Sequence, residues 1–201
     1  MKEQKDKPMP DIVFKVMSFI FVIRDRFRSP AKQLQEVGIK EGQTVLDYGC
    51  GPGSYAIPAA KLVGEGGTVY ALDIHPLAIE AVERKAKKSR LANITTIISG
   101  KDTGLPGESM DVVLAYDMIH SVRDKRALLE ELYRVMKPEG LLSIAADHIK
   151  PEAILEIAEK DGLFSLRDRH GNLLNLEKNG DRLSRPKNGA PDIGSSKQPA
   201  V

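Results

Sequence analysis

The sequence has 201 residues, of which 41% are hydrophobic and 29% charged. A chain of this size can bury one sizeable core and has little left for a second domain. Its formal net charge of +2 gives no indication of a polyanionic partner. The single cysteine, Cys50, excludes an internal disulfide and any zinc site built on several cysteines, which fits a reducing compartment, so we expect a cytoplasmic protein.

An apolar N-terminal segment is the first predicted element. Residues 12–23 are apolar apart from Lys15 and Ser18, but this run is much shorter than the roughly 20 residues that span a bilayer. Charged residues follow it, where an export signal would show a cleavage site. We expect residues 1–29 to form a helical segment that packs on the domain. A lid over an apolar substrate, a membrane-surface contact through residues 12–28 and a dimer contact are the alternatives, and the oligomeric state stays open.

From residue 30 to residue 178, strand-like and helical patterns alternate. Ser29 and Pro30 start a short helix that Gly38 ends. Strands are expected at 44–48, 68–73, 94–99, 111–116 and 141–147, and the helices between most of them at 54–63, 76–89 and 125–137. This alternation predicts an α/β domain in which a mostly parallel sheet is covered on both faces.

The C-terminal end of the domain breaks the alternation. A helix over 151–161 stops at Gly162, and strands over 163–169 and 173–178 flank His170-Gly171-Asn172 as a hairpin. The sheet should therefore finish with an antiparallel strand. Residues 179–201 have almost no apolar content and are expected to form a disordered tail.

A glycine-rich stretch follows the first strand of this domain. In VLDYGCGPGSYA, residues 45–56, the segment GPGSYA fits the dinucleotide pattern GxGxxA, and Asp73 follows about twenty residues later. A nicotinamide-dependent oxidoreductase is therefore one candidate. However, Asp47 would place a like charge near a pyrophosphate, whereas it would attract a ligand that carries an ammonium group and a sulfonium.

Four stretches together resemble a known family. VLDYGCGPGSY, VYALDIHP, MDVVLAYDMIH and ELYRVMKPEGLLSI are similar to the successive motifs of class I S-adenosylmethionine-dependent methyltransferases, in particular the small-molecule group that includes the ubiquinone and menaquinone C-methyltransferases. The resemblance runs from about residue 30 to residue 178. It implies a Rossmann-like, seven-stranded sheet with a terminal antiparallel hairpin, S-adenosylmethionine as cofactor, and transfer of its methyl group to O, S, N or an activated C of a small molecule.

The same resemblance implies which residues bind the cofactor. Gly49, Gly51 and Gly53 would let the backbone approach its methionine half, near Asp47. The remaining cofactor-binding candidates are Asp73 for the ribose, Ile74 for the adenine ring, Asp102 for the adenine amino group, and Tyr116. At the position where the family usually has that adenine-binding aspartate, this sequence has Lys101, so Asp102 would serve only with a shifted loop.

Methyl transfer is an in-line displacement, so an enzyme has to align the acceptor and, for an acidic acceptor, remove a proton. Candidates for this base at the carboxyl ends of the fourth and fifth strands are Tyr116, Asp117, His120, Asp147 and His148, of which we favour Asp117, His120 and His148. No metal is expected. The alternative is a cation held by Asp117, Asp147 and His148, as in catechol-type O-methyltransferases.

The expected partner is a small-molecule acceptor of apolar or planar character. The basic run between Arg84 and Arg90 lies on a predicted helix away from the strand ends, so we interpret it as a solvated face and expect no nucleic acid. Three functions remain: a small-molecule methyltransferase, which we favour, an NAD-dependent oxidoreductase, and a non-catalytic methyltransferase-like binding subunit.

Overall fold

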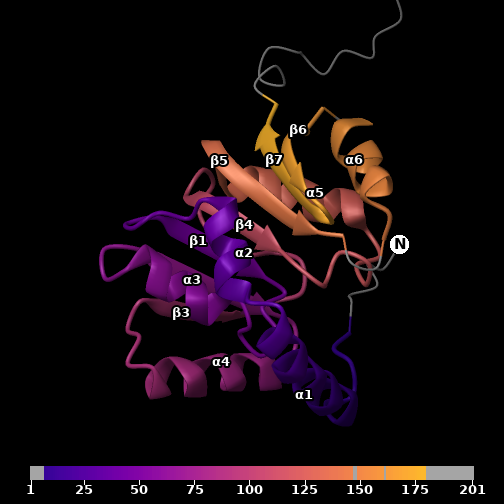
Figure 1. The fold of residues 1–201 in the computed structure, drawn as a ribbon. Helices are drawn as coiled ribbons and strands as arrows, with labels where there is room; N and C mark the ends of the chain where they lie inside the picture. The colour runs from indigo at the N-terminus through magenta and orange to yellow at the C-terminus, as the bar shows by residue number, and fades with distance from the viewer. Residues whose placement is uncertain (1–6, 147–148, 161, 180–201) are drawn as a thin grey trace, which may run out of the picture.

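The computed structural model describes residues 7–146, 149–160 and 162–179, which form six helices and seven strands (Figure 1). The helices are α1 (Asp11–Phe27), α2 (Pro30–Val37), α3 (Ala56–Val63), α4 (Pro76–Lys88), α5 (Lys125–Val135) and α6 (Pro151–Lys160). The strands are β1 (Thr44–Tyr48), β2 (Thr68–Asp73), β3 (Ile94–Ile98), β4 (Met110–Ala115), β5 (Met136–Ala145), β6 (Phe164–His170) and β7 (Leu173–Lys178).

One seven-stranded sheet organises the chain, in the order β3-β2-β1-β4-β5-β7-β6. β3, β2, β1, β4 and β5 pair in parallel, whereas β7 pairs antiparallel with both β5 and β6. The predicted mostly parallel sheet with a terminal antiparallel hairpin is therefore confirmed. The hairpin turn contains two residues, and Gly171 adopts a left-handed φ of 61° in it.

Helices cover both faces of the sheet because alternate strand residues point to opposite sides. Val45 on β1 belongs to the hydrophobic core beneath α2, α3 and α4, and its neighbour Leu46 belongs to the core beneath α5 and α6. α1 belongs to neither layer (Figure 1). Instead, its Phe14 stacks on His75, the N-cap residue of α4, with ring centroids 4.3 Å apart.

Two predicted boundaries were wrong. α3 begins at Ala56 rather than Ser54, because the chain first completes a turn in which Gly53 has a φ of 84°. β5 begins directly after α5, because Met136 already pairs with Met110 of β4. Most of the predicted disordered tail, from residue 180 onward, lies outside the described residues.

Candidate functional site

A cavity of about 590 Å³ lies at the carboxyl ends of the parallel strands. β2 and β3 lie on one side of β1, and β4 and β5 lie on the other, so the strand order reverses next to β1. Such a reversal leaves a crevice where α/β proteins bind ligands. The walls come from the ends of the four strands β1 to β4 and from the N-terminal segment. They include Tyr48, Gly49, Gly51, Leu72, Asp73, Ile74, His75, Ser99, Gly100, Tyr116, Asp117, Met118, Val122 and, from the N-terminal segment, Met9, Phe14, Met17 and Phe21.

The loop after β1 needs glycine at position 49, because any side chain there would clash with Met118. Gly49 has a φ of 78°, and a Cβ atom there would lie 2.8 Å from Cγ of Met118. Gly53, with a φ of 84°, similarly faces Val82 of α4, and it lies behind the loop rather than in the cavity wall. The bare backbone therefore allows the residues after β4 and α4 to pack closely against the loop.

The amides of this loop are already used within the protein. The backbone N–H groups of Gly49 and Cys50 donate to the carbonyl oxygen of Leu72, at 2.8 and 2.9 Å, and that of Gly53 donates to Cys50. The N–H of Gly51 donates to Oδ2 of Asp73 at 2.9 Å. A pyrophosphate at a dinucleotide-binding loop needs such N–H groups to point at the ligand, so this arrangement disfavours the nicotinamide alternative.

Asp73, at the end of β2, presents a fixed carboxylate to the cavity. Its Oδ2 accepts the bond from Gly51, and its Oδ1 accepts one from the backbone N–H of His75 at 2.8 Å. Each carboxylate oxygen has a second lone pair, so Asp73 can still accept hydrogen bonds from two hydroxyl groups of a ligand. This is the geometry expected for a ribose-binding residue.

Asp47, on β1, is a buried carboxylate that lacks a full set of partners. Its side chain is 1% exposed and accepts a hydrogen bond from the backbone of Ala56, but no described residue donates to its Oδ2. Burial, and to a lesser extent the charge of Asp73, raise the pKa of Asp47 to about 7. A buried oxygen without a donor is unfavourable unless a ligand supplies the donor.

α1 closes the cavity from the N-terminal side. Phe14, Met17 and Phe21 line it, and Phe21 lies 3.8 Å from the position of a Cβ on Gly51. Arg24 forms an ion pair with Asp117, the second residue after β4, which adopts a left-handed φ of 57°. The helix is thereby tied to the cavity wall by both apolar packing and an ion pair.

The start of the N-terminal segment is held by His75. The backbone N–H of Leu77 donates to Nδ1 of His75, which leaves Nε2 to donate to the carbonyl oxygen of Met9 at 3.0 Å. His75 thus caps α4 and anchors Met9.

Of the two predicted catalytic residues that the structure describes, Asp117 and His120, only one lines the cavity. Asp117 lies in the cavity wall, whereas His120 is exposed and outside the wall. Asp147 and His148 lie outside the described residues, so the structure places neither the second histidine nor the alternative metal site. Tyr116 is in the wall, but its Oη is hydrogen-bonded to Oγ of Ser143 at 2.7 Å, and burial raises its pKa.

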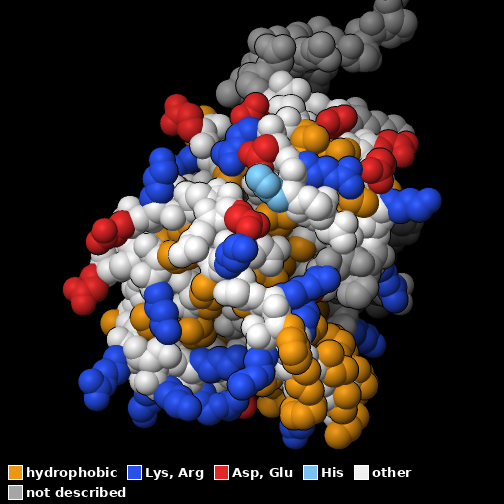
Figure 2. All heavy atoms as spheres, viewed as in Figure 1, with side chains coloured by type: hydrophobic (Ala, Val, Ile, Leu, Met, Phe, Trp, Pro, Cys, Tyr) orange, Lys and Arg blue, Asp and Glu red, His pale blue; other side chains and the backbone are white. Residues whose placement is uncertain are grey.

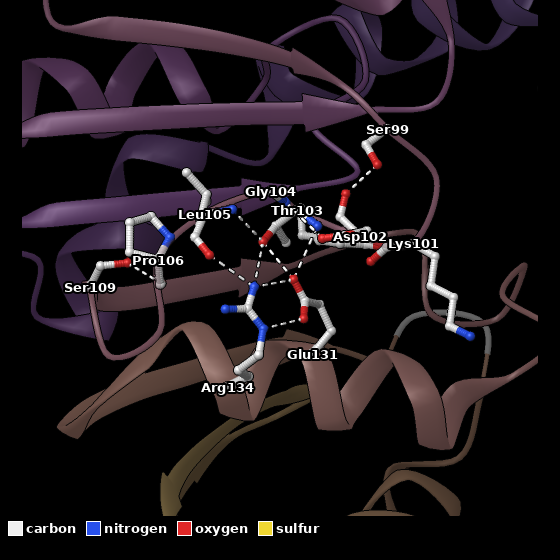
Figure 3. A network of polar contacts seen from close by, with 11 residues as sticks. Ser99, Lys101, Asp102, Thr103, Gly104, Leu105, Pro106, Ser109, Glu131 and Arg134 are labelled. Atoms are coloured by element: carbon white, nitrogen blue, oxygen red, sulfur yellow. Dashed lines mark hydrogen bonds and ion pairs between the residues drawn. The ribbon is translucent and has the colours of Figure 1, made fainter.

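On the side expected for adenine, Ile74 lies in the cavity wall and Asp102 does not. Oδ1 of Asp102 accepts the backbone N–H of Gly104 at 2.9 Å, and its carbonyl accepts from Oγ of Ser99 (Figure 3). The exposed Asp102 carboxylate therefore forms a local turn. Ser99 and Gly100 line the cavity in its place, and Oη of Tyr48 holds the Gly100 carbonyl at 2.8 Å.

Several wall residues were missed by sequence reasoning. Met118 and Val122 follow β4, where only titratable residues were expected in the site, and Tyr48 precedes the glycines. The available signal was their position at or beyond the carboxyl end of a strand, since Tyr48 is the last residue of β1. Ser99 and Gly100 belong to the same category, because both directly follow β3.

The chain matches a family model described as "Methyltransferase domain" over residues 39–172. It is 29% identical over 125 residues to the demethylmenaquinone methyltransferase of Geobacillus sp. (strain WCH70), a match that covers 62% of this chain and 53% of the relative. It is 31% identical over 134 residues to nocamycin O-methyltransferase of Saccharothrix syringae, covering 66% and 48%. The chain thus spans about half the length of these curated relatives.

Solved structures show the same similarity. A SAM-dependent methyltransferase from Aquifex aeolicus superposes with a TM-score of 0.65 at 30% identity, over 74% of this chain and 87% of that one. A Methanococcus maripaludis protein, at only 16% identity, has the same fold with a TM-score of 0.73 over 89% of this chain and 97% of its own. With the sheet order, the glycine loop and Asp73 in place, these matches show that the chain belongs to the class I S-adenosylmethionine-dependent methyltransferases.

Proposed function

We propose that this protein transfers a methyl group from S-adenosylmethionine to a small-molecule acceptor in the cavity beneath α1. The observation that carries the proposal is that one cavity combines a ribose-type carboxylate, Asp73, with the glycine loop and an apolar wall. Relatives that methylate small molecules support the same reaction class.

The residues present fit the cofactor. Asp47 is not in the cavity wall, but it lies two residues before Gly49, which is. The ammonium group of the methionine half would have to reach past this backbone to supply the donor that Oδ2 of Asp47 lacks. Asp73 would hold the ribose hydroxyls, with Ile74 and Tyr116 against the rest of the ligand. S-adenosylmethionine supplies a methyl group that is already activated on a sulfonium.

The acceptor side of the cavity is apolar. Phe14, Met17 and Phe21 face it from the N-terminal segment, and Met118 and Val122 from the segment after β4. Lys7, Ser121 and Arg123 also line the cavity. The apolar part of the wall favours an acceptor with an apolar or planar body, because burying such a body against apolar side chains is favourable. The names of the relatives, demethylmenaquinone and nocamycin methyltransferase, are consistent with an organic acceptor of this kind.

α1 acts in this proposal as a lid over residues 30–178, the methyltransferase domain. It excludes water and restricts the acceptor, which are the main tasks that methyl transfer leaves to a protein. Asp117 is the candidate base in the wall, and its pairing with Arg24 keeps the carboxylate oriented. His120 and His148 stay predictions.

Calorimetric titration with S-adenosylhomocysteine is the first test, with NADH as the control ligand. We expect binding of S-adenosylhomocysteine only, lost in Asp73→Ala and retained in Glu65→Ala, which removes an exposed carboxylate from the loop after α3. Binding of NADH, or no binding of S-adenosylhomocysteine by a folded protein, would contradict the proposal.

A second assay follows transfer of a labelled methyl group to a panel of planar and apolar acceptors. Transfer abolished by Asp73→Ala is the expected result. Tight S-adenosylhomocysteine binding without transfer to any organic acceptor would instead favour the non-catalytic binding subunit.

A further inference from the structure

α1 is apolar on both sides, and only one side is covered. Phe14 is buried and Phe21 faces the cavity, but eight other apolar side chains of the helix are between 43% and 84% exposed. They form the outer face of α1, defined by Ile12, Val13, Val16, Phe19, Ile20, Val22, Ile23 and Phe27. Figure 2 shows this face as a dense apolar patch. Patches of this kind mark interaction surfaces.

Basic side chains border the outer face. Lys15 and Arg26 are eleven residues apart, which is about three helical turns, so they lie along the same edge of α1. Both are exposed, as is Arg28 just beyond the helix. Lysine and arginine side chains lie beside the patch, mainly above it and to its left in the space-filling view (Figure 2).

The charge around the outer face is positive overall. Residues 7–28 contain five basic and two acidic residues. Of the two acidic ones, Asp25 is paired with Arg24. On the neighbouring α4, Lys85 lies close enough to Asp25 to interact with it electrostatically, which extends the basic border. A partner of this face must therefore be apolar at its centre and anionic around it.

Among the described residues, no helix is both long enough and apolar enough to cross a bilayer. A helix with an exposed apolar face and a basic edge instead lies in the plane of a membrane interface, where anionic lipid head groups attract the edge. A second copy of this chain would match the apolar centre but would bring a border of the same sign.

We propose that the outer face of α1 docks on an anionic lipid surface, with Phe19 and Ile23 inserted and Lys15 and Arg26 at the head groups. Because the opposite side of the same helix lines the cavity, docking would hold the cavity beside the membrane. This inference depends on the surface of α1 alone and does not rest on which acceptor is methylated.

Vesicle sedimentation tests the proposal with the full-length protein. We expect binding to vesicles of phosphatidylcholine with phosphatidylglycerol, and much weaker binding to pure phosphatidylcholine. Phe19→Ser with Ile23→Ser should reduce the partition coefficient at least about tenfold, and Lys15→Gln with Arg26→Gln roughly thirtyfold at low salt. The matched control Leu166→Ser, on the exposed part of β6, should bind as the native protein does.

Three results would overturn the proposal. The first is no sedimentation with anionic vesicles, and the second is equal binding by the native protein and the Phe19→Ser, Ile23→Ser variant. The third is a dimer in light scattering that this variant dissociates, which would identify the face as a contact between copies.

A fluorescent reporter avoids any dependence on the folding of the double variants. The chain has no tryptophan, so Phe19→Trp introduces a single indole into the outer face. Its emission should shift to shorter wavelength on anionic vesicles and be quenched by brominated lipid. An emission spectrum unchanged by vesicles would place this residue outside the bilayer and refute the docking.

Discussion

Replacing Asp47 with asparagine tests whether a buried, ionisable carboxylate destabilises the fold in order to serve the cofactor site. The pKa of Asp47 is about 7 in the folded protein, against an ordinary value of 3.8. The folded state therefore binds a proton more tightly than the unfolded state does. The stabilisation from protonated Asp47 is present at low pH and is lost as the pH rises through 7.

The size of the effect follows from the shift in pKa. A difference of about three pKa units corresponds to about 4 kcal/mol between the two limits. Roughly 2 kcal/mol of this should be lost between about pH 5.5 and pH 8.5, because the folded group titrates inside that window. Asparagine has the same size and stays neutral, so Asp47→Asn should not show this loss.

Urea unfolding of both proteins at these two pH values measures the difference. The free energy of unfolding of the native protein should fall by about 2 kcal/mol more than that of Asp47→Asn, while Glu65→Gln, which removes an exposed carboxylate, should follow the native protein. If the free energy of unfolding depended on pH in the same way in the native protein and in Asp47→Asn, this prediction would be refuted. Asp47 would then have the same pKa in the folded and the unfolded state.

The same carboxylate predicts how cofactor binding depends on pH. If ionised Asp47 pairs with the ammonium group of S-adenosylhomocysteine, the dissociation constant should rise about tenfold for each pH unit below 7. Asp47→Asn should bind weakly and without this dependence. Calorimetry over pH 6 to 8 would detect this pH dependence. A dissociation constant that does not change with pH in the native protein would mean that Asp47 does not pair with the amino group of the ligand.

Two further predictions concern the glycine loop and α1. Gly49→Ala should lower stability by roughly 1 to 3 kcal/mol more than Gly38→Ala, because both have a positive φ but only at Gly49 would Cβ meet Met118; equal melting temperatures of the two variants would contradict this. Arg24→Gln and Asp117→Asn should show a coupling of about 1 kcal/mol in a double-mutant cycle of unfolding, and strictly additive effects would mean that the ion pair does not hold α1.

Much of the fold follows from local sequence patterns. The alternation of apolar strands with amphipathic helices correctly predicted the parallel sheet, and the segment around Gly171 correctly predicted the antiparallel hairpin. Both predictions depend on residues close together in the chain. The predicted start of α3 was wrong because the turn that contains Gly53 delays the helix to Ala56. The predicted start of β5 was wrong because Met136 pairs with Met110, which is distant in the sequence.

The candidate site divides in the same way. Gly49, Asp73 and Asp117 could be found from the sequence because they lie at the carboxyl end of a strand or within two residues of it, and strand ends meet at one edge of a parallel sheet. Asp102 lies four residues after β3, and its carboxylate accepts a hydrogen bond from Gly104, an arrangement that depends on the path of one short loop.

By itself, the sequence determined the fold class, the family motifs and the glycine loop, since each depends on the spacing of residues that lie close together in the chain. Only the tertiary structure decided that α1 lies over the cavity with Arg24 on Asp117, that Asp47 is buried with an oxygen that no described residue satisfies, and that the outer face of α1 stays exposed. These features join residues far apart in the chain, and the free energy of such contacts depends on burial and distance, which linear order does not contain.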